Sequence, residues 1–342
     1  MPGFLSFVRV QYTDLPLPQP PSNISGGTYV VTGANTGLGF ECAKHLFQMG
    51  AGRIILAVRS REKGKAALDV IRRETGRQGV GEVWELDLMS LESVEIFSKR
   101  LGTLERVDGL IANAGVVMTQ FQTIEGVESS LLVNVVSTML LAFRALPKLQ
   151  ESARRFDIQP RLVIVTSNSA LDNDMKMRVE KLQGDVFDAL STEKGFNTFT
   201  QYPTTKLLEI YAVRELASLL PVSDTGVIIN TVNPGLCYSS LDRNGTFMLR
   251  MMMAVMRALL ARSTEKGSRN LLQAAFAGPD SHGTYCSECQ IRDNVVPAWI
   301  TDKAGKGTQE RVWKDLLKRL DSTGHSIDLT ALKAEKKGGV KI

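Results

Sequence analysis

Thr-Gly-Ala-Asn-Thr-Gly-Leu-Gly, residues 32–39, lies between the apolar run Tyr29-Val30-Val31 and a stretch with helical periodicity. Glycine suits a point where a strand turns tightly into a helix, because backbone N–H groups can then approach a phosphate that a side chain would keep away. The amino end of the following helix would face the anion. The sequence therefore predicts a phosphate-binding turn between a strand and a helix.

A second apolar run supports this prediction, since a glycine-rich turn alone is equally typical of an ordinary loop. Ile54–Val58 follows Gly39 after the length of one helix and completes the βαβ unit that binds dinucleotides. Arg59 comes next, where its charge could meet the ribose of an adenosine. The first sixty residues thus favour a dinucleotide site.

Apolar runs and helical periodicity alternate along the rest of the chain. The runs that we predict to be strands are Tyr29–Thr32, Ile54–Val58, Val83–Leu86, Gly109–Ala112, Leu162–Thr166 and Val227–Val232, with a seventh near Thr284–Ile291. Parallel neighbours need crossover connections, and these are usually helices. The expected fold class is therefore α/β, a single doubly wound Rossmann-type domain with a mainly parallel seven-stranded sheet and helices on both faces.

The chain ends differ in composition from this central part. Prolines from Pro16 to Pro21 predict an extended lead-in, because proline removes a backbone donor. One helix is expected over Gly305–Leu320, followed by a polar, mobile tail from Asp321. We divide the chain into a lead-in (1–26), a catalytic domain (27–292) that includes an insertion (171–200) and a substrate lid (236–262), and a C-terminal helical extension with a basic tail (293–342).

Composition excludes some partners. Lys and Arg exceed Asp and Glu by 41 to 36, but the surplus is dispersed apart from Lys333–Lys337, so nucleic-acid binding is not expected. Met1–Arg9 lacks the long apolar core of a secretory signal. Phe247–Leu260 is too short to span a bilayer and is interrupted by arginines, which predicts an amphipathic helix. A soluble, cytoplasmic protein is expected, and contact with a membrane surface is the less favoured alternative.

The four cysteines, Cys42, Cys237, Cys286 and Cys289, are too few and too scattered for a disulfide framework, which favours a reducing compartment. Cys286 and Cys289 have the spacing of a redox or zinc pair. No second pair accompanies them, so we interpret them as inert thiols near a strand and expect no metal site.

A second informative stretch is Tyr202-Pro203-Thr204-Thr205-Lys206, which opens a predicted helix. Positions i and i+4 share a helix face, so Lys206 can place its ammonium near the phenol of Tyr202. A nearby positive charge lowers the pKa of a phenol from about 10. The pair would then serve as an acid or base near neutral pH, unless Tyr202 is simply exposed and Lys206 solvated.

With these motifs the sequence resembles the short-chain dehydrogenase/reductase family from about Thr28 to Ile291. The glycine turn, the Asn113-Ala114-Gly115 motif and the Tyr202/Lys206 pair occur in the family's order. Within the family, the chain looks most like the branch of retinol dehydrogenases and WW-domain oxidoreductases, which includes many fungal members.

The resemblance implies further site residues. The family's catalytic serine corresponds to Ser167, with Ser169 as the alternative, and a strand-end serine could polarise a substrate carbonyl oxygen. Asn134 corresponds to the helix asparagine that holds a water leading to the lysine. The implied cofactor-binding residues are Gly33, Asn35, Thr36, Gly37, Leu38, Gly39, Arg59, Asp87, Leu88, Asn113, Ala114, Gly115, Tyr202, Lys206, Pro234 and Gly235.

Two departures from the family's pattern carry information. Ser167 and Tyr202 lie further apart in sequence than in compact members, and the intervening Leu171–Thr200, with helical character around Phe187–Ser191, is expected to border the substrate mouth. Where NAD-dependent members carry an acid after the second strand, this chain has Arg59, whose paired donors suit a 2′-phosphate.

NADP is therefore the expected cofactor, although Thr36 replaces the second basic residue of some NADP-dependent relatives. Asp87 corresponds to an adenine contact but could equally cap the next helix. Arg59 could also be a solvated cation at a strand end.

These features predict an NADP(H)-dependent oxidoreductase that transfers hydride to or from a carbonyl or secondary alcohol. A medium-sized apolar substrate is expected because methionines between Phe247 and Met256 could line an adaptable pocket, although such residues more often form core or a partner surface. The alternatives are a non-catalytic NADP-sensing protein and a membrane-surface retinoid or lipid dehydrogenase. The resemblance implies a homodimer through the helices of Asn134 and Tyr202, unless the C-terminal extension covers that face.

Overall fold

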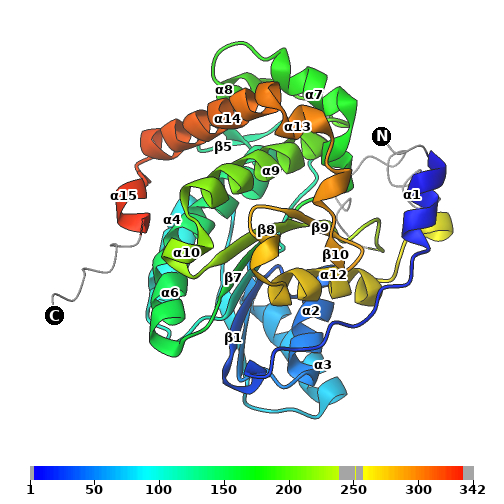
Figure 1. Ribbon diagram of the computed structural model, residues 1–342, viewed down its shortest axis with the longest axis vertical. Coiled ribbons are helices and arrows are strands. Elements are labelled where there is room, and N and C mark those ends of the chain that lie inside the picture. Colours follow the sequence, from blue (N-terminus) through cyan, green and yellow to red (C-terminus); the bar gives the residue numbers. More distant parts are fainter. Residues whose placement is uncertain (1–3, 239–250, 252–256, 334–342) are drawn as a thin grey trace.

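The computed structural model describes residues 4–238, 251 and 257–333. Among these residues, eight strands form one sheet in the order β10-β9-β8-β7-β4-β1-β2-β3. Figure 1 shows β1, β7, β8 and β9 within this sheet at the centre of the molecule. Its strands are β1 Thr28–Thr32, β2 Arg53–Val58, β3 Gly81–Glu85, β4 Gly109–Ala112, β7 Arg161–Val165, β8 Ile228–Val232, β9 Tyr285–Ser287 and β10 Gln290–Ile291. All neighbours pair in parallel except β9 and β10. The predicted α/β class with a mainly parallel sheet is confirmed.

The six strands of this sheet that precede β9 match the predicted runs, with ends that differ by at most a few residues. The seventh strand expected near Thr284–Ile291 is present as β9, but the predicted total of seven strands is wrong, because β10 follows β9 and pairs with it in an antiparallel hairpin. Glu288 and Cys289 turn the chain there with φ values of 49° and 55°. Residues other than glycine seldom adopt this conformation, so composition alone does not reveal the turn.

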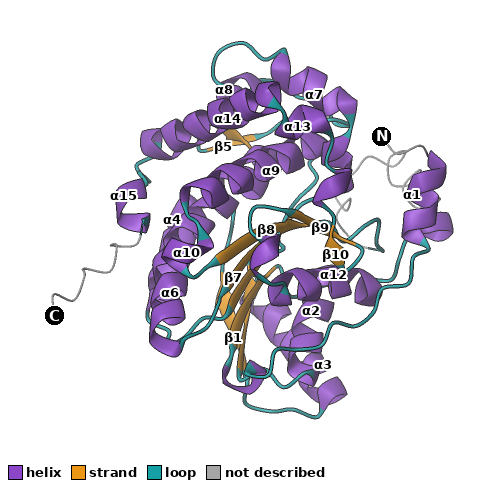
Figure 2. Cartoon of the chain, viewed as in Figure 1, coloured by secondary structure: helices purple, strands orange, loops and turns teal. Residues whose placement is uncertain are grey.

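Helices cover both faces of the sheet (Figure 2). On one face lie α2 Gly37–Gln48, α3 Arg61–Thr75 and α12 Thr264–Phe276, and on the other lie α4 Leu91–Gly102, α6 Thr138–Phe156 and α9 Gln201–Leu219. Successive residues of a strand point to opposite faces of the sheet, so each strand contributes side chains to the hydrophobic core on either face. Val30 packs with the α4–α6–α9 side, whereas Val31 packs with the α2–α3–α12 side. The chain is therefore a doubly wound, three-layer domain.

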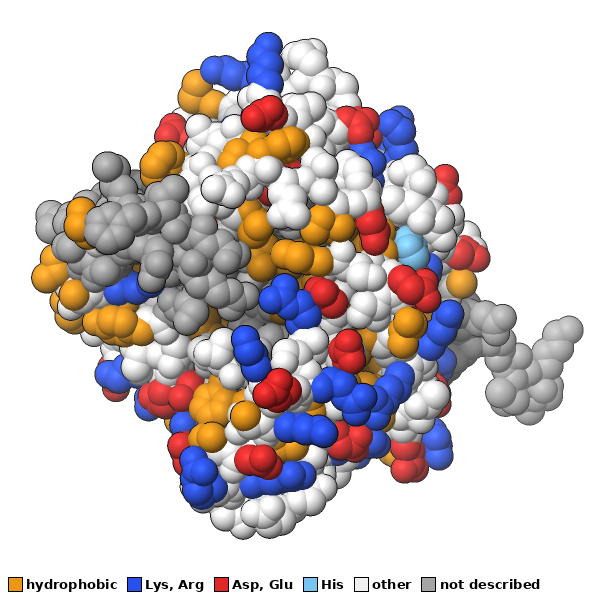
Figure 3. All heavy atoms as spheres, turned by 180° about the vertical axis from the view of Figure 1, so that it is seen from behind, with side chains coloured by type: hydrophobic (Ala, Val, Ile, Leu, Met, Phe, Trp, Pro, Cys, Tyr) orange, Lys and Arg blue, Asp and Glu red, His pale blue; other side chains and the backbone are white. Residues whose placement is uncertain are grey.

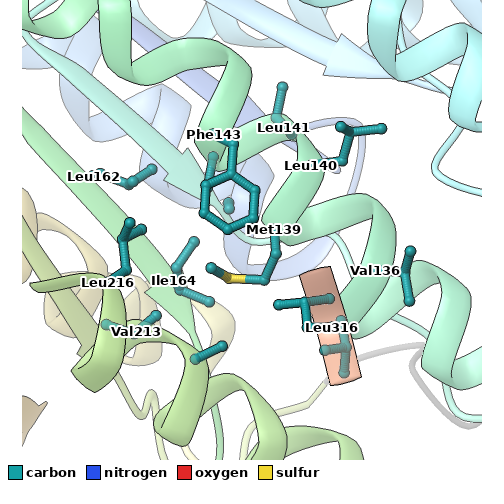
Figure 4. Close-up of a cluster of buried hydrophobic side chains, with 14 of the residues drawn as sticks. Val136, Met139, Leu140, Leu141, Phe143, Leu162, Ile164, Val213, Leu216 and Leu316 are labelled. Carbon is teal, nitrogen blue, oxygen red and sulfur yellow. The ribbon is translucent and has the colours of Figure 1, made fainter. Parts of the chain in front are cut away.

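The core on the α6 side is built from long apolar side chains. Figure 4 shows Met139 and Phe143 from α6 pointing toward Leu162 and Ile164 of β7 and toward Val213 and Leu216 of α9. Helix α6 continues the short helix α5 Ser129–Leu131 and the π-helical turn η2 Leu132–Ser137. The combined helix is long and apolar enough to cross a membrane, but 94% of its most apolar window is buried within the protein. That burial is typical of a core helix.

Charged side chains are interspersed on the surface. Figure 3 shows Lys and Arg next to Asp and Glu over the face opposite to that of Figure 1, without a field of one sign. Lys44, for example, lies 2.8 Å from Glu41, and Arg53 lies 2.6 Å from Glu82. This arrangement agrees with the dispersed charge of the sequence.

The N-terminal segment differs from the expected extended lead-in. Residues Phe4–Gln11 form helix α1, and a short 3-10 turn, η1, covers Ile24–Gly26. The prolines restrict the backbone only from Pro16 onward, so they do not prevent the residues before them from forming a helix. Only the middle of the segment is extended.

The C-terminal extension is also more structured than predicted. The expected single helix corresponds to α14 Lys303–Ser322, but α13 Ala298–Thr301 precedes it and α15 Leu329–Leu332 follows. The prediction of a mobile tail from Asp321 is wrong up to Lys333, because Leu332 is buried and its carbonyl accepts a 2.7 Å bond from Gln150 Nε2 on α6. Lys333 to Ile342, the basic tail, lies almost entirely outside the described residues.

Helix α14 closes the core over α9 and α6. Its buried residues include Trp313, whose ring meets that of Phe143 edge to face at 5.5 Å, and Leu316, which is fully buried (Figure 4). The extension therefore belongs to the folding unit and covers part of the outer face of the Tyr202 helix.

Replacing Leu316 by Ala is expected to lower the free energy of unfolding by about 2–5 kcal/mol, because it removes buried methyl groups and leaves a cavity. Lys314→Ala on the exposed side of the same helix is the matched control and should change the value by less than about 0.5 kcal/mol. Urea denaturation followed by circular dichroism measures both. Equal effects of the two substitutions would show that α14 is not part of the cooperative core.

The structure describes the predicted insertion but not most of the predicted lid. Residues 171–200 contain helices α7 Asn173–Glu180 and α8 Val186–Leu190, and α8 confirms the helix expected near Phe187. The lid at 236–262 and its methionines lie largely outside the described residues. Its two ends are held together by a parallel bridge between Cys237 and Arg262.

Candidate functional site

The carboxyl ends of four neighbouring strands meet at one edge of the sheet. β1 leads into the glycine turn, β4 into Asn113-Ala114-Gly115, β7 into Ser167 and β8 into Asn233-Pro234-Gly235. β1 and β4 mark the place where the strand order reverses, and such a switch point opens a crevice in a doubly wound sheet. A cleft of about 580 Å³ lies there and is lined by all four segments.

The glycine turn is shaped by close contacts. Gly33 has φ of 66° and Gly37 of 63°, a left-handed conformation that glycine adopts without strain. A Cβ on Gly39 would lie 2.6 Å from Nδ2 of Asn113 and 2.7 Å from the carbonyl oxygen of Gly33. Gly33 and Gly37 are therefore required by their left-handed backbone conformation, and Gly39 is required because there is no room for a Cβ atom.

The amino end of α2 is open toward the cleft. Its N-cap, Thr36, makes no side-chain capping bond, and Thr36, Gly37 and Leu38 line the cleft. By contrast, Ser60 caps α3 and Ser90 caps α4 through their hydroxyls. The first N–H groups of a helix need acceptors, and their positive end favours an anion. This end therefore fits the pyrophosphate of a dinucleotide.

Asn113 joins the turns that follow β1 and β4. Its Nδ2 donates to the carbonyl of Thr32 at 2.9 Å, and the hydroxyl of Thr32 accepts from Ala114 N at 2.9 Å. Asn113, Ala114 and Gly115 all line the cleft. The predicted Asn-Ala-Gly motif thus holds the glycine turn in place and forms part of the wall of the cleft.

Arg59 and Asp87 lie at the end of the cleft nearest β2 and β3. Arg59 is exposed and follows β2 directly, while Asp87 and Leu88 line the same region. Asp87 Oδ1 accepts from Met89 N at 3.0 Å, so its carboxylate orders the turn, but the N-cap of α4 is Ser90. The alternative that Asp87 caps the next helix is therefore wrong.

Ser167 lies between Tyr202 and Ser169. Its hydroxyl accepts from Ser169 Oγ at 3.0 Å and lies near enough to the Tyr202 phenol to lower the pKa of that phenol. Ser167 also accepts from Ser169 N at 3.3 Å, which fixes the turn after β7. Of the two serines left open by the sequence, Ser167 is the one that acts on the phenol, and Ser169 donates to Ser167.

Lys206 is 4% exposed and lies over the Tyr202 ring, 5.6 Å from its centroid. The shared helix face predicted for these two residues is confirmed. Lys206 Nζ donates to the carbonyl of Val165 and to Glu209 Oε1, both at 2.8 Å. Burial lowers the pKa of Lys206, but Glu209 and Tyr202 together outweigh that effect and raise it, so the lysine stays an ammonium.

The predicted net effect on Tyr202 is wrong in sign. Burial raises the pKa of the phenol, the Lys206 ammonium lowers it, Glu209 raises it again, and the net shift is upward. Burial disfavours the phenolate because a low dielectric penalises charge. Tyr202 is therefore a phenol at neutral pH, which suits the donation of a proton.

Asn134 is fully buried in the π-helical turn η2. Its Oδ1 accepts from Val116 N at 2.9 Å, and its Nδ2 donates to Val116 O and to Thr205 Oγ1, both at 3.0 Å. These bonds tie the loop after β4 to the Tyr202 helix. These bonds account for the presence of an asparagine within a helix, because its side chain connects two segments of the fold. They also place the Asn134 side chain against the loop that borders Lys206.

The N-terminal segment contributes to the site in a way that the sequence did not reveal. Gln11 Nε2 donates to the carbonyls of Leu236 and Leu260 at 2.9 and 3.0 Å, and Leu236 N donates to Gln11 Oε1. Arg262 Nε donates to the carbonyl of Gln11 at 3.2 Å. Gln11 thus joins both ends of the segment that follows the Pro234-Gly235 turn. No local pattern reveals a contact between residues 225 positions apart.

Glu209 is a second residue of the site that the sequence analysis missed, although the sequence contains a pattern that could have indicated it. It is a carboxylate three positions after Lys206 in the otherwise apolar run Leu207-Leu208-Glu209-Ile210. Residues three apart share a helix face.

The cysteines behave as ordinary thiols. Cys286 is buried on β9 and Cys289 lies in the following turn, and both are free. Burial raises the pKa of Cys286 to about 12 and that of Cys289 to about 11, so both stay protonated. Within the described residues, no group of three or more His, Cys, Asp or Glu side chains could hold a metal ion.

Comparisons with known proteins agree with this geometry. A family model for short chain dehydrogenases matches residues 28–248. The chain is 42% identical over 315 residues to the short chain dehydrogenase/reductase dmxR8 of Cryptosporiopsis sp. (strain 8999), covering 90% of this chain and 94% of that protein. It is 35% identical over 329 residues to the short-chain dehydrogenase anuD of Penicillium roqueforti (strain FM164), covering 95% and 85%.

A solved structure shows the same fold. The short-chain dehydrogenase from Sphingobium yanoikuyae in complex with NADPH matches with a TM-score of 0.58 and 19% identity, over 84% of this chain and 95% of that chain. Sequence and fold therefore agree over most of the chain, and the chain belongs to the short-chain dehydrogenase/reductase family, as a member of its fungal type.

Proposed function

We propose that the protein is an NADP(H)-dependent oxidoreductase that reduces a carbonyl group, or oxidises a secondary alcohol, with Tyr202 as the proton donor or acceptor. Members of the family are oxidoreductases that use a nicotinamide cofactor on small molecules. The observation that carries the proposal is that Ser167, Tyr202 and the buried Lys206 line one cleft together with the open end of α2, with Lys206 over the Tyr202 ring.

Bound NADPH would supply the hydride. Ser167 would donate a hydrogen bond to the carbonyl oxygen and stabilise the charge that develops there. Tyr202 would transfer its proton to the same oxygen, and the adjacent ammonium of Lys206 would stabilise the phenolate that remains. Asn134 would support the return of a proton by holding the Val116 loop against the Tyr202 helix.

Reduction is the direction that the electrostatics favour. The raised pKa of Tyr202 keeps the phenol protonated at neutral pH, so the donor is ready for carbonyl reduction. Oxidation needs the phenolate and would become fast only in alkaline solution.

The preference for NADP over NAD rests on Arg59. Its exposed guanidinium follows β2 at the adenosine end of the cleft, where an acid would repel a 2′-phosphate. The solved relative from Sphingobium yanoikuyae contains NADPH, which is consistent with this proposal.

Replacing Arg59 by Ala is expected to raise the KM for NADPH by about 10- to 100-fold, because charge-assisted bonds to the phosphate are lost. The KM for NADH, which has no 2′-phosphate, should stay within about twofold. Arg61→Ala is the matched control, since Arg61 is exposed at the start of α3 and does not line the cleft. An equal loss with both cofactors would show that Arg59 does not select NADPH.

The substrate is proposed to be a medium-sized, largely apolar molecule. Val116, Val117 and Leu236 line the cleft, together with Phe199 at the end of the insertion. Phe199 is 70% exposed, which places an aromatic ring at the rim. The expectation that the insertion borders the substrate mouth is consistent with this position.

The decisive experiment is a panel of ketones and alcohols tested with NADPH and NADH, followed by nicotinamide absorbance. Turnover of an apolar ketone with NADPH supports the proposal. NADPH binding without turnover of any member would favour the alternative of a cofactor-sensing protein, and cosedimentation of the active enzyme with liposomes would favour a membrane-surface dehydrogenase.

We propose a cytoplasmic location, in keeping with the free cysteines. A homodimer through the helices of Asn134 and Tyr202 is disfavoured on the α9 side, because α14 already packs against that helix.

A further inference from the structure

Glu209 is a carboxylate buried beside the proposed active site. It is 1% exposed, and its Oε1 lies 2.8 Å from Nζ of Lys206, which is itself 4% exposed. The neighbouring Leu207, Leu208 and Ile210 are fully buried and apolar. Burying an ion pair costs free energy that an apolar side chain of similar size would not, so packing alone does not account for a charge here.

The geometry orients the ammonium of Lys206. An ammonium has three N–H donors, and the carbonyl of Val165 and the Glu209 carboxylate accept two of them from opposite elements, β7 and α9. The third donor can serve a group in the cleft, which Lys206 lines. Without Glu209 the ammonium would be held by one buried bond and could rotate.

The same carboxylate acts on Tyr202. The ionisable groups that act on the phenol are Lys206, which favours the phenolate, and Glu209, which opposes it. The groups brought by the other elements, the Ser167 hydroxyl after β7 and the Asn134 amide of η2, are uncharged. Burial raises the pKa of the Glu209 carboxyl to about 7, against the opposing effect of the Lys206 ammonium. Above neutral pH, where Tyr202 loses its proton, Glu209 is therefore a carboxylate that offsets part of the influence of Lys206.

We propose that Glu209 is a positioning residue that orients the Lys206 ammonium toward the cleft and, by its negative charge, keeps the Tyr202 proton on the phenol, which biases the enzyme toward reduction. The inference rests on the proposed function, because it assigns Glu209 to the same reaction. The direction of the bias follows from charge alone. Removing the carboxylate stabilises the phenolate and favours oxidation.

Two substitutions in the full-length enzyme separate charge from orientation. Glu209→Gln keeps an oxygen that can accept from Lys206 but removes the charge, whereas Glu209→Leu removes both. Glu209→Gln should shift the pH of half-maximal alcohol oxidation down by about one unit, so that on the rising, alkaline part of the profile the variant oxidises alcohol about tenfold faster than the wild type. Glu209→Leu should in addition raise the KM for NADPH about fivefold, because one orienting bond is lost.

Glu215→Gln is the matched control, since it makes the same chemical change further along α9. Its pH profile and its KM for NADPH should equal those of the wild type. Thermal unfolding verifies that each variant is folded. If Glu209→Leu does not fold, Glu209→Gln alone tests the inference.

A second measurement does not depend on turnover. Ultraviolet titration of tyrosinate, with the signal of Tyr202→Phe subtracted, reports the ionisation of Tyr202, which should occur at lower pH in Glu209→Gln than in the wild type. If the wild type turns over no substrate, the proposed function fails while this titration still tests Glu209. A titration and a pH profile that both match Glu215→Gln would overturn the inference.

Discussion

Replacing Tyr202 by Phe is expected to lower turnover of a carbonyl substrate with NADPH by about 1,000-fold or more, while NADPH binding changes by less than about twofold. The substitution removes only the hydroxyl, so the ring still packs under Lys206 and lines the cleft. Ser167 would remain to polarise the carbonyl but could not replace the lost proton, because an ordinary serine hydroxyl is a far weaker acid than a phenol.

The measurement combines steady-state nicotinamide absorbance with a fluorescence titration of NADPH. Tyr211→Phe is the control, because Tyr211 lies on the same helix, is buried in the core and does not line the cleft. It should retain turnover within about twofold and lose at most about 1 kcal/mol of stability. Full activity of Tyr202→Phe would refute the assignment of the proton donor.

Replacing Gly39 by Ala is expected to abolish measurable NADPH binding. The added Cβ would lie 2.6 Å from Asn113 Nδ2 and 2.7 Å from the Gly33 carbonyl, and the second contact is with backbone that cannot rotate away. The glycine turn would have to shift and carry the open end of α2 with it. A loss of binding of at least about 100-fold should follow, with about 1–3 kcal/mol of destabilisation from overpacking.

Gly102→Ala provides the comparison for this prediction. Gly102 closes α4, and a Cβ there meets no atom within 4 Å. Isothermal titration should show the NADPH affinity of the wild type, and thermal unfolding should show no loss of stability, since alanine is the better helix former. Undiminished NADPH binding by Gly39→Ala would mean that the phosphates do not lie against this turn.

Features that depend on neighbouring residues were predictable. Gly33 and Gly37 adopt the left-handed backbone that a tight turn requires, and Tyr202 and Lys206 lie on one helix face because they are four residues apart. Arg59 also follows β2 directly, as the end of the apolar run Ile54–Val58 predicted. Periodicity and spacing act over a few residues, so a single sequence carries this information.

Features that depend on distant residues were not predictable. The hairpin at Glu288 and Cys289 uses positive φ values that neither residue type demands. The docking of Leu332 on α6 and of Gln11 on Leu236 joins segments from opposite ends of the chain. Both terminal segments are polar or rich in proline, and local composition therefore predicted less structure than they have.

The sequence by itself determined the strand-turn-helix that opens the domain, the order of the strands along the chain and the pairing of Tyr202 with Lys206, because each follows from local geometry. The tertiary structure decided the net acidity of Tyr202 and the surroundings of Lys206. Burial and the Glu209 carboxylate raise the pKa of the Tyr202 phenol, and together they outweigh the lowering effect of the Lys206 ammonium. Solvent exclusion and the sum of nearby charges exist only once the helices and strands are packed together.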